Sequence, residues 1–358
     1  MITIGVDAHK SVHVALAMDE HGRHLGEWRG PNAVVGWNDL AVWSLEFGPA
    51  CQWGIEGAWN NGRGLAQHLV SLGATVFEIN ARWTARERRS SRKLGKSDRL
   101  DARAVADCVR KEAPNLPAVL REDDTVLLDM LTIERDAAVA ECTKLRNQIH
   151  ALLLQLDPSY RSQLPALTTA AGLAALQGYE PTSDSELQHY RAAAVRRLAQ
   201  RLTLAVTQAK DLAKQIRELA QRRFAPLTRI CGVNLLTAGA IAGMLGPGSR
   251  FASEAQLAAY AGVAPLETSS AGITRHRLNR GGNRRLNALV YRVVLTQAHH
   301  HPQARAYIAR RMSEGKTRRD AHRCLRRYVV RAIWGHWREC LQVPNHESAE
   351  ECATTTCT

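Results

Sequence analysis

Two aspartates three residues apart, Asp98 and Asp101, begin a segment whose apolar residues recur at helical intervals as far as Arg110. Positions i and i+3 share one face of a helix, so both carboxylates point the same way. They lie in the first turn, where the helix dipole favours negative charge. One interpretation is purely structural, an acidic helix start with Ser97 as N-cap. The other is chemical and requires partner carboxylates.

Two such partners stand upstream, each at the end of a strand predicted to be buried. Residues 1–6 read as a strand that runs into Asp7, and residues 51–55 as a strand that runs into Glu56. Hard divalent cations take oxygen ligands, and two of them about 4 Å apart can clamp the attacking and leaving oxygens of a phosphodiester. Strand-end carboxylates together with a pair on a helix therefore predict a two-metal site that acts on nucleic acid.

The order of elements around these residues predicts an α/β fold. Hairpins come first, then helices and strands alternate; the predicted strands are 2–6, 12–17, 24–28, 51–55 and 74–79, and the predicted helices are 32–47 and 60–72. Three antiparallel strands followed by this alternation is the order of the ribonuclease-H-like sheet. In that fold, carboxylates at strand ends meet a final helix that carries the remaining acids. We therefore expect a ribonuclease-H-like (RuvC-like) N-terminal domain.

Composition indicates a folded, basic protein with a polyanionic partner. The 358 residues carry a formal net charge of +14 and include 45% hydrophobic residues. No apolar run approaches the roughly 20 residues that span a bilayer. The N-terminus reads as a strand and lacks the features of a signal peptide, so we expect a cytoplasmic protein without a membrane partner. Eight scattered cysteines without a CxxC pair indicate reduced thiols rather than disulfides or zinc.

Basic residues gather in three stretches. Seven of them, against one acid, separate the fifth predicted strand from Asp98. A solvated basic loop is the simple interpretation, but beside four carboxylates we favour contact with a phosphate backbone. The candidate nucleic-acid-binding residues are Arg82, Arg86, Arg88, Arg89, Arg92, Lys93 and Lys96, then Arg275, Arg277, Arg280, Arg284 and Arg285, and finally Arg318, Arg319, Arg323 and Arg327.

The rest of the chain is predicted to be helical. Apolar residues at four-three spacing predict long helices in 125–156 and 198–219, whose seam closes either within one chain or between two. Residues 227–242 resemble a helix-hairpin-helix, with Gly232 and Asn234 suited to positive φ. The expected domains are the RuvC-like domain 1–118, a coiled-coil dimerisation segment 119–225, a mostly α C-terminal domain 226–345 and a polar tail 346–358.

Taken in order, these motifs resemble one family. It is the insertion-sequence transposases that join an N-terminal RuvC-like DEDD domain to a C-terminal serine transposase domain, also called bridge-RNA-guided recombinases. The resemblance runs from about residue 2 to 340. It rests on the sequences around Asp7, Glu56 and Asp98, on Leu257-Ala258-Ala259-Tyr260-Ala261-Gly262-Val263-Ala264-Pro265, and on Arg280-Gly281-Gly282-Asn283.

The resemblance implies more than the residues alone do. Asp7, Glu56, Asp98 and Asp101 would hold Mg²⁺, with two sites per active centre. A serine would attack DNA and form a covalent phosphoserine; Ser270 is favoured and Ser269 is the alternative. A noncoding RNA of the element would pair with donor and target DNA. Homodimers would assemble into a tetramer that acts on the bacterial nucleoid. Which basic stretch meets RNA and which meets DNA stays open.

Three other functions compete with this one. A RuvC-like Holliday-junction-type endonuclease would use water as the nucleophile and leave no covalent protein–DNA product. A catalytically silent scaffold would only bind nucleic acid, which the complete set of four carboxylates argues against. A sugar-kinase or actin-like ATPase would need glycine-rich phosphate loops after the first strands, and none occurs between Asp7 and Glu27.

Overall fold

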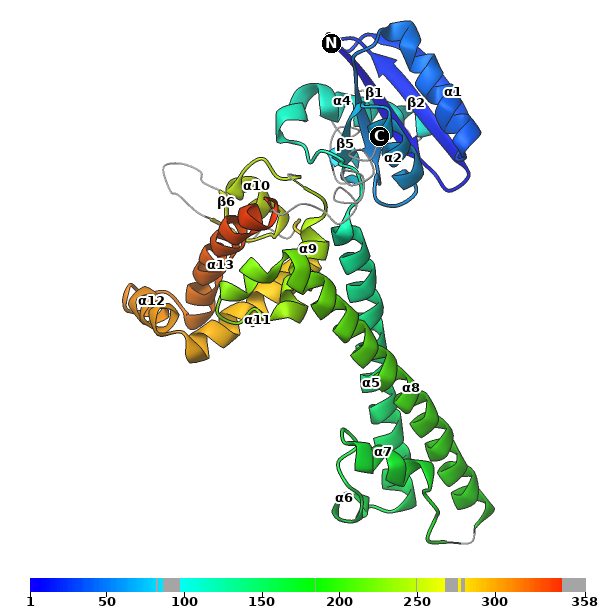
Figure 1. Cartoon of the computed structure of the whole chain (residues 1–358), viewed down its shortest axis with the longest axis vertical. Helices are drawn as coiled ribbons and strands as arrows, with labels where there is room; N and C mark the ends of the chain where they lie inside the picture. The colour runs from blue at the N-terminus through cyan, green and yellow to red at the C-terminus, as the bar shows by residue number, and fades with distance from the viewer. Residues whose placement is uncertain are drawn as a thin grey trace, which may run out of the picture. The chain divides into compact units, whose positions relative to one another are not determined.

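The protein divides into two compact units (Figure 1). A computed structural model describes residues 1–81, 83–85, 97–183, 185–248, 250–267, 276–277 and 281–342. The first unit comprises Met1–Asp123, Leu245–Asn287 and Arg326–Trp334, and the second comprises Asp124–Met244, Ala288–Leu325 and the residues from Gly335 onward. The first unit thus includes a segment from the C-terminal third of the chain. The domain boundaries expected from the sequence remain predictions.

A five-stranded mixed sheet forms the centre of the first unit. Its strands are β1 (Ile2–Ala8), β2 (Val12–Met18), β3 (His24–Pro31), β4 (Cys51–Glu56) and β5 (Thr75–Ile79). They lie in the order β3-β2-β1-β4-β5. The first three strands are antiparallel, whereas β4 runs parallel to β1 and β5 parallel to β4. Three antiparallel strands followed by strands that alternate with helices agree with the sequence-based expectation of a ribonuclease-H-like sheet, whereas the parallel pairing of β4 and β5 was not predicted.

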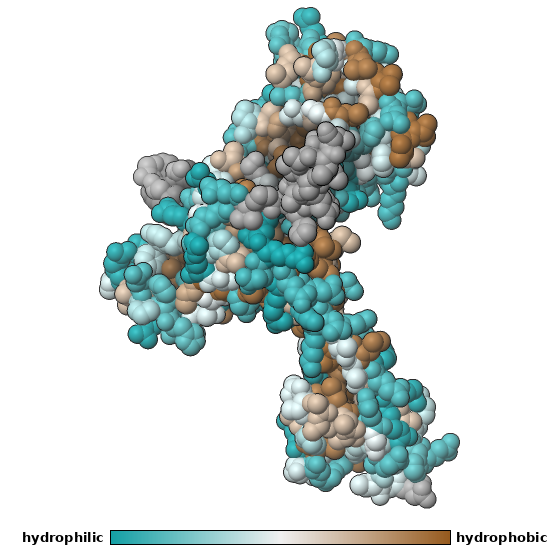
Figure 2. All heavy atoms as spheres, viewed as in Figure 1, coloured by the Kyte–Doolittle hydropathy of each residue, from teal (hydrophilic) through white to brown (hydrophobic). Residues whose placement is uncertain are grey.

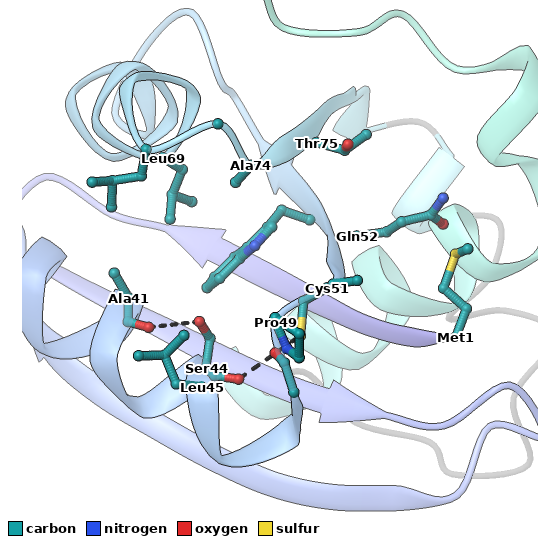
Figure 3. A pocket seen from close by; sticks show the side chains of 15 residues that line it. Met1, Ala41, Ser44, Leu45, Pro49, Cys51, Gln52, Leu69, Ala74 and Thr75 are labelled. Carbon is teal, nitrogen blue, oxygen red and sulfur yellow. Dashed lines mark hydrogen bonds between the residues drawn. The ribbon is translucent and has the colours of Figure 1, made fainter.

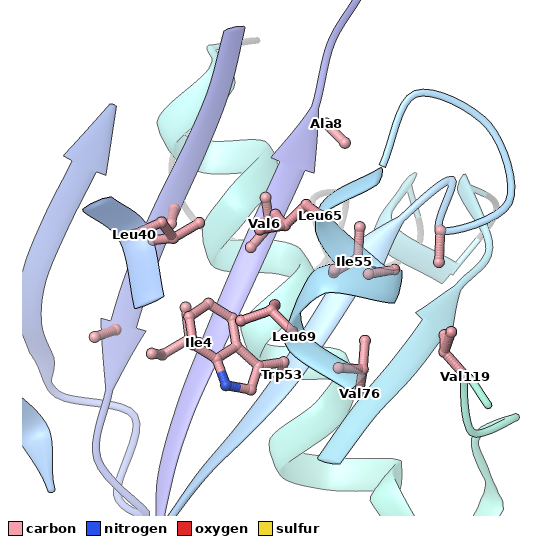
Figure 4. Close-up of a cluster of buried hydrophobic side chains, with 14 residues drawn as sticks. Ile4, Val6, Ala8, Leu40, Trp53, Ile55, Leu65, Leu69, Val76 and Val119 are labelled. Atoms are coloured by element: carbon pink, nitrogen blue, oxygen red, sulfur yellow. The ribbon is translucent and has the colours of Figure 1, made fainter. Parts of the chain in front are cut away.

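One face of the sheet is covered by α1 (Val34–Ser44) and α2 (Arg63–Ser71). Alternate residues of β1 point into this layer, where Ile4 and Val6 pack with Leu40, Trp53 and the apolar side of α2 (Figure 4). The outer side of α1 is also apolar. Hydrophobic residues therefore reach the surface in the part of the molecule that carries α1, as Figure 2 shows.

The opposite face is covered by α4 (Asp98–Glu112), which packs on β1, β2 and β4. Two glycines paired across neighbouring strands, Gly5 and Gly54, allow this helix to lie unusually close to the sheet. A Cβ atom built on Gly5 would lie 2.3 Å from the carbonyl oxygen of Ala102, and one built on Gly54 would lie 2.4 Å from a methyl carbon of Val109. The close contact therefore requires glycine at both positions.

Several strand ends differ from the sequence-based expectation, and two of the differences involve the acidic residues. β1 continues to Ala8 and β4 to Glu56, so Asp7 and Glu56 belong to the strands instead of following them. Antiparallel pairing with β2 continues β1 past Val6, with Asp7 opposite Val14, and parallel pairing with β5 continues β4 to Glu56, which lies opposite Ile79. The expected cap of α4 is confirmed, because the Ser97 hydroxyl accepts a hydrogen bond from the backbone N–H of Leu100 at 3.3 Å.

In the second unit, α5 (Asp124–Leu156) and α8 (Glu186–Arg223) lie side by side (Figure 1). The apolar seam predicted from the sequence is buried between them within one chain, with Leu145 and Ile149 of α5 in the same cluster as Val195 and Leu202 of α8. The residues that connect α5 to α8 include two short helices, α6 (Tyr160–Gln163) and α7 (Ala170–Gln177). Whether a second chain also uses these helices stays a prediction.

The remaining elements are mostly short helices. They are the 3₁₀ turns Leu45–Phe47, Ala113–Asn115 and Ala225–Arg229, the helices α9 (Leu235–Leu245), α10 (Glu254–Tyr260), α11 (Arg284–His300), α12 (Pro302–Ser313) and α13 (Arg318–Cys340), and the two-residue strands β6 (Leu266–Glu267) and β7 (His276–Arg277). Before α9, Gly232 has the expected positive φ of 90°, whereas Asn234 caps the helix by accepting from the Thr237 N–H at 2.9 Å. The helix-hairpin-helix itself stays a prediction.

Membrane-spanning helices and disulfides are both unexpected from the sequence. Within the described ranges, no helix is long and apolar enough to cross a membrane. The six cysteines that the structure describes are all free thiols.

We predict that Gly5→Ala destabilises the protein by about 1–3 kcal/mol, because the added methyl group overlaps the backbone of α4 and the helix must move. Chemical denaturation monitored by circular dichroism would measure the change. Gly178→Ala is the matched control, since nothing lies within 4 Å of a Cβ atom at that residue. Equal stability of the two variants would contradict the close packing of α4 on the sheet.

Candidate metal centre

Four acidic residues from three elements meet at one edge of the sheet. β1 and β4 are adjacent and parallel, with Val6 opposite Ile55, so Asp7 and Glu56 end up at the same edge. Asp7 lies on the face that α4 covers, because Gly5, two residues earlier, touches that helix. The first turn of α4 brings Asp98 and Asp101 to this face. The structure therefore brings together all four carboxylates proposed from the sequence, and their role as ligands stays a prediction.

A histidine that the sequence analysis did not assign belongs to the same cluster. His9 Nε2 lies 3.1 Å from Asp7 Oδ2 and 3.6 Å from Asp98 Oδ1. One ligand atom from each of these three residues lies within 4.8 Å of the others, a spacing that could hold a metal ion. Since side chains alternate along an extended chain, the spacing Asp7-x-His9 is a signal that was available in the sequence.

Burial and repulsion by the other carboxylates disfavour the charged form of Asp7 in this cluster. Asp7 and Asp101 are each only 7% exposed. Burial raises the pKa of Asp7 to about 6; His9 opposes this rise, while Asp101, Glu56 and Asp98 add to it. The Oδ2 atom of Asp7 is buried and accepts no aligned hydrogen bond, although His9 lies close enough to form an ion pair. Carboxylates crowded in this way favour either a proton or a cation.

The loop that carries His9 is held by Asn32. The side-chain amide of Asn32 donates to the carbonyl oxygens of His9 and Lys10, both at 3.2 Å, and to that of Asn61 at 3.0 Å. Trp37 in turn donates to Asn32 Oδ1 at 3.0 Å. One amide thus links the end of β1 to the turn that follows Glu56. The contact depends on residues far apart in the sequence, so no local pattern could have revealed it.

Cations from β3 and α4 border the cluster. Arg29 Nη1 lies 3.6 Å from Asp98 Oδ2, and Arg99 forms an ion pair with Glu27. Both arginines are largely exposed, so their charges are partly screened by water. Arg29 was not among the residues proposed from the sequence. Its exposed position beside the carboxylates suits contact with a phosphate group as well as with Asp98.

Many of the other proposed residues lie outside the described ranges. These are Arg82, Arg86, Arg88, Arg89, Arg92, Lys93, Lys96, Ser269, Ser270, Arg275 and Arg280, together with the side chain of Arg277. Among the described ones, Arg284 and Arg285 begin α11, and Arg318 and Arg319 begin α13. Arg323 instead pairs with Asp320, and Arg327 with Glu254, so each of these two already has an acidic partner within the protein.

A cavity of about 380 Å³ lies at the opposite ends of the strands (Figure 3). Its lining includes Met1, which precedes β1, Cys51, the first residue of β4, and Thr75, the first residue of β5. Asp7 and Glu56 are at the other ends of their strands. This cavity is therefore separate from the carboxylate cluster.

The raised pKa of Asp7 predicts a pH-dependent effect of Asp7→Asn in protein kept free of metal by EDTA. Below the ordinary value of 3.8 the carboxyl is neutral whether the protein is folded or unfolded. As the pH rises towards 6, ionisation destabilises the folded state by at most about 3 kcal/mol, a penalty that asparagine lacks. Thermal unfolding should show the variant gaining stability over wild type between pH 4 and 6, with a constant advantage above that. Adding a divalent cation at pH 7.5 should stabilise only the wild type. If the variant were no more stable than the wild type at pH 7.5 in EDTA, the raised pKa of Asp7 would be contradicted.

Arg318 and Arg319 yield a prediction about nucleic-acid binding. Both are exposed cations in the first turn of α13, where the helix dipole disfavours positive charge, so they do not serve helix stability. Replacing both with alanine should lower the slope of log affinity against log salt by about 0.9 for each phosphate that the protein no longer neutralises, for every sequence alike. Filter binding at several salt concentrations would measure this. Arg201→Ala with Lys214→Ala is the control, because these cations pair with Glu141 and Glu218; equal slopes in the two double variants would count against phosphate binding by α13.

Comparison with known proteins agrees with this geometry. Residues 4–158 match the model of a transposase DEDD domain, and residues 225–309 match that of the transposase IS116/IS110/IS902 family. The T. thermophilus RuvC structure in complex with a Holliday junction substrate aligns with 32% of this chain and 93% of its own, at 12% identity and a TM-score of 0.25. The assignment of the fold rests on the strand order and not on this weak alignment.

Three curated relatives span much of the chain. An uncharacterized protein of insertion element IS110 from Streptomyces coelicolor is 28% identical over 68% of this chain and 71% of its own. The transposase for insertion sequence element IS1328 of Yersinia enterocolitica is 27% identical over 63% and 65%. An uncharacterized IS900 protein of Mycobacterium paratuberculosis is 26% identical over 94% and 95%. With both family matches in order along one sequence, the chain belongs to the IS110/IS116 family of insertion-sequence transposases.

Proposed function

We propose that this transposase cuts and rejoins DNA strands at Mg²⁺ held by Asp7, Glu56, Asp98 and Asp101. The observation that carries the proposal is the meeting of four carboxylates from β1, β4 and α4 at one edge of the sheet, where burial raises the pKa of Asp7 to about 6. At neutral pH such a cluster is unfavourable without a compensating charge, and a divalent cation supplies it. When bound, the ion would polarise the phosphodiester and stabilise the charge that develops on it.

The donor set fits a hard divalent cation. Carboxylate oxygens dominate, and the single imidazole of His9 lies beside Asp7 and Asp98. Neighbouring strands position Asp7 and Glu56, whereas one helix turn positions Asp98 and Asp101. Rigid elements thus hold all four acids, as a site that must act within tenths of an ångström requires.

The nucleophile in this proposal is the hydroxyl of Ser270, with Ser269 as the alternative. The serine oxygen attacks phosphorus, the bond from phosphorus to one sugar oxygen breaks, and that oxygen leaves with a proton. The product is a phosphoserine, which a sugar hydroxyl of a second strand attacks to restore a phosphodiester and free the serine. Support comes from the family membership and from the Ser269-Ser270 pair that precedes Arg280-Gly281-Gly282-Asn283 in the sequence.

The proposed partners are donor and target DNA and a guide RNA from the element. The net charge of +14 supports a polyanionic partner, and the exposed arginines at the start of α13 offer part of the surface. A homodimer that assembles into a tetramer would bring the strands together. The guide RNA and the assembly rest on the family resemblance described above.

One observation favours a second function, cleavage by water. His9 is half-exposed and lies against Asp7, so its imidazole is placed to accept a proton from a water molecule at the cluster. In that case the protein would be a RuvC-like endonuclease and the serines would play no chemical part. A silent scaffold would require neither the cation nor the serines.

The covalent intermediate separates these functions. Wild-type protein incubated with labelled DNA, Mg²⁺ and RNA transcribed from the element's ends should give a DNA–protein adduct on a denaturing gel. Ser270→Ala should lose the adduct and strand exchange while keeping cation and DNA binding, because removing one hydroxyl changes no charge. Ser269→Ala is the matched control and should retain the adduct.

The outcomes assign the function directly. Loss of the adduct in Ser269→Ala alone would move the nucleophile to that residue. Free DNA ends without an adduct from wild type would favour the endonuclease, and an accompanying loss of cleavage in His9→Ala would support water activation. Absence of any cleavage with Mg²⁺ would favour the scaffold.

A further inference from the structure

A second cavity, of about 540 Å³, lies beside the outer edge of β5. Its described lining comes from the end of β5 and just beyond it, from the segment before α5 and from the segment around α10: Glu78, Asn80, Trp83, Asn115, Pro117, Arg250, Phe251, Gln256, Ala259, Tyr260, Gly281, Gly282 and Asn283. All of these residues belong to the first unit. The backbone of residues 117–119 pairs with the edge of β5, since Glu78 N–H donates to Pro117 O at 2.9 Å. The cavity shares no lining residue with the carboxylate cluster.

The described lining of this cavity includes one arginine, Arg250, whose charge is already paired with that of an acidic residue. Arg250 is 9% exposed, forms an ion pair with Glu78 and lies 4.9 Å from the ring centre of Tyr260 and 5.4 Å from that of Phe251. Among the described residues that line the cavity, no other is a cation. An anionic phosphate would therefore meet the Glu78–Arg250 pair rather than a free positive charge, so the cavity is unsuited to the nucleic-acid backbone.

The walls combine aromatic rings with amides. Trp83 is 43% exposed and presents a large ring at the cavity, while the hydroxyl of Tyr260 accepts from the Asn283 amide at 2.7 Å. Gln256 and Asn115 contribute further amide groups. A planar ligand with an aromatic face and an edge of donors and acceptors matches such walls. That description fits a nucleobase, which proteins bind by stacking on aromatic rings and by hydrogen bonds to its edge.

The cavity and the carboxylates lie at the same edge of the sheet. β5 is parallel to β4, and β4 to β1, so the residues after β5 lie at the same edge of the sheet as Asp7 and Glu56. Two strand spacings separate β1 from β5, roughly 10 Å. An extended single strand held at the carboxylate cluster could reach the cavity within a few nucleotides.

We propose that this cavity receives one unstacked base of the DNA strand held at the carboxylate cluster, with Trp83 as its stacking platform. The inference rests on the proposed function, because it assumes that a DNA strand occupies that cluster. It adds a base-binding subsite that is chemically separate from phosphate binding. The site tolerates different bases, since stacking depends on the aromatic face that all of them share.

The test compares normal and abasic single-stranded DNA. Trp83→Ala in the full chain should weaken binding of an oligonucleotide by roughly fivefold to a hundredfold, as expected for removal of one stacked base. The salt slope should not change, because the variant leaves every phosphate interaction in place. On an oligonucleotide whose sugars all lack bases, wild type and Trp83→Ala should bind equally. Trp83→Phe should restore most of the affinity, and Tyr190→Ala, which removes an exposed aromatic ring in the second unit, should have no effect.

Each outcome decides the proposal. Equal affinity of wild type and Trp83→Ala for normal DNA, in a wild type that binds and cleaves it, overturns the base site and leaves the proposed function standing. Wild type that binds no DNA overturns both. An RNA oligonucleotide of the same sequence forms the third arm: dependence on Trp83 for RNA but not for DNA overturns the assignment to DNA and moves the cavity to the guide.

Discussion

The contact between α4 and the sheet at Gly5 and Gly54 is the constraint on which the candidate site depends. Each glycine stands two residues before a carboxylate on the same strand, so glycine and acid share one face. Where the glycines permit close approach, the helix descends onto β1 and β4. Its first turn then delivers Asp98 and Asp101 to the edge that carries Asp7 and Glu56. Without this approach the acids of α4 would lie farther from those of β1 and β4.

Such an arrangement concentrates negative charge, and two of its members, Asp7 and Asp101, are nearly buried. Only part of this negative charge is balanced, by His9 beside Asp7 and Arg29 beside Asp98. His9 lies in a loop positioned by the amide of Asn32, so its place depends on the packed unit and not on the strand alone. The remaining imbalance appears as the raised pKa of Asp7. The proposed binding of a cation would offset the cost of burying these carboxylates together.

A segment from the C-terminal third completes the same unit. Arg250 joins it to β5 through Glu78, and its guanidinium is enclosed by the rings of Trp59, Phe251 and Tyr260. Further along, Gly282 meets the backbone of Gly262, where a Cβ atom would lie 2.3 Å away. Asn283 then caps α11 by accepting from the Leu286 N–H at 3.0 Å. Gly282 and Asn283 of the Arg280-Gly281-Gly282-Asn283 motif therefore have structural roles alongside any contact with nucleic acid.

The sequence by itself determined the local features: the strands, the Ser97 cap, the paired acids of α4 and the order that identified the family. These follow from periodicity and capping, which act over a few residues. Arg29 and Asn32 emerged only from the folded chain, as did the grouping of residues 245–287 with the N-terminal sheet. Their contacts join residues distant in the chain, and no local pattern specifies which distant side chains meet. Tertiary packing decides that, because it is set by how closely helix and sheet can approach.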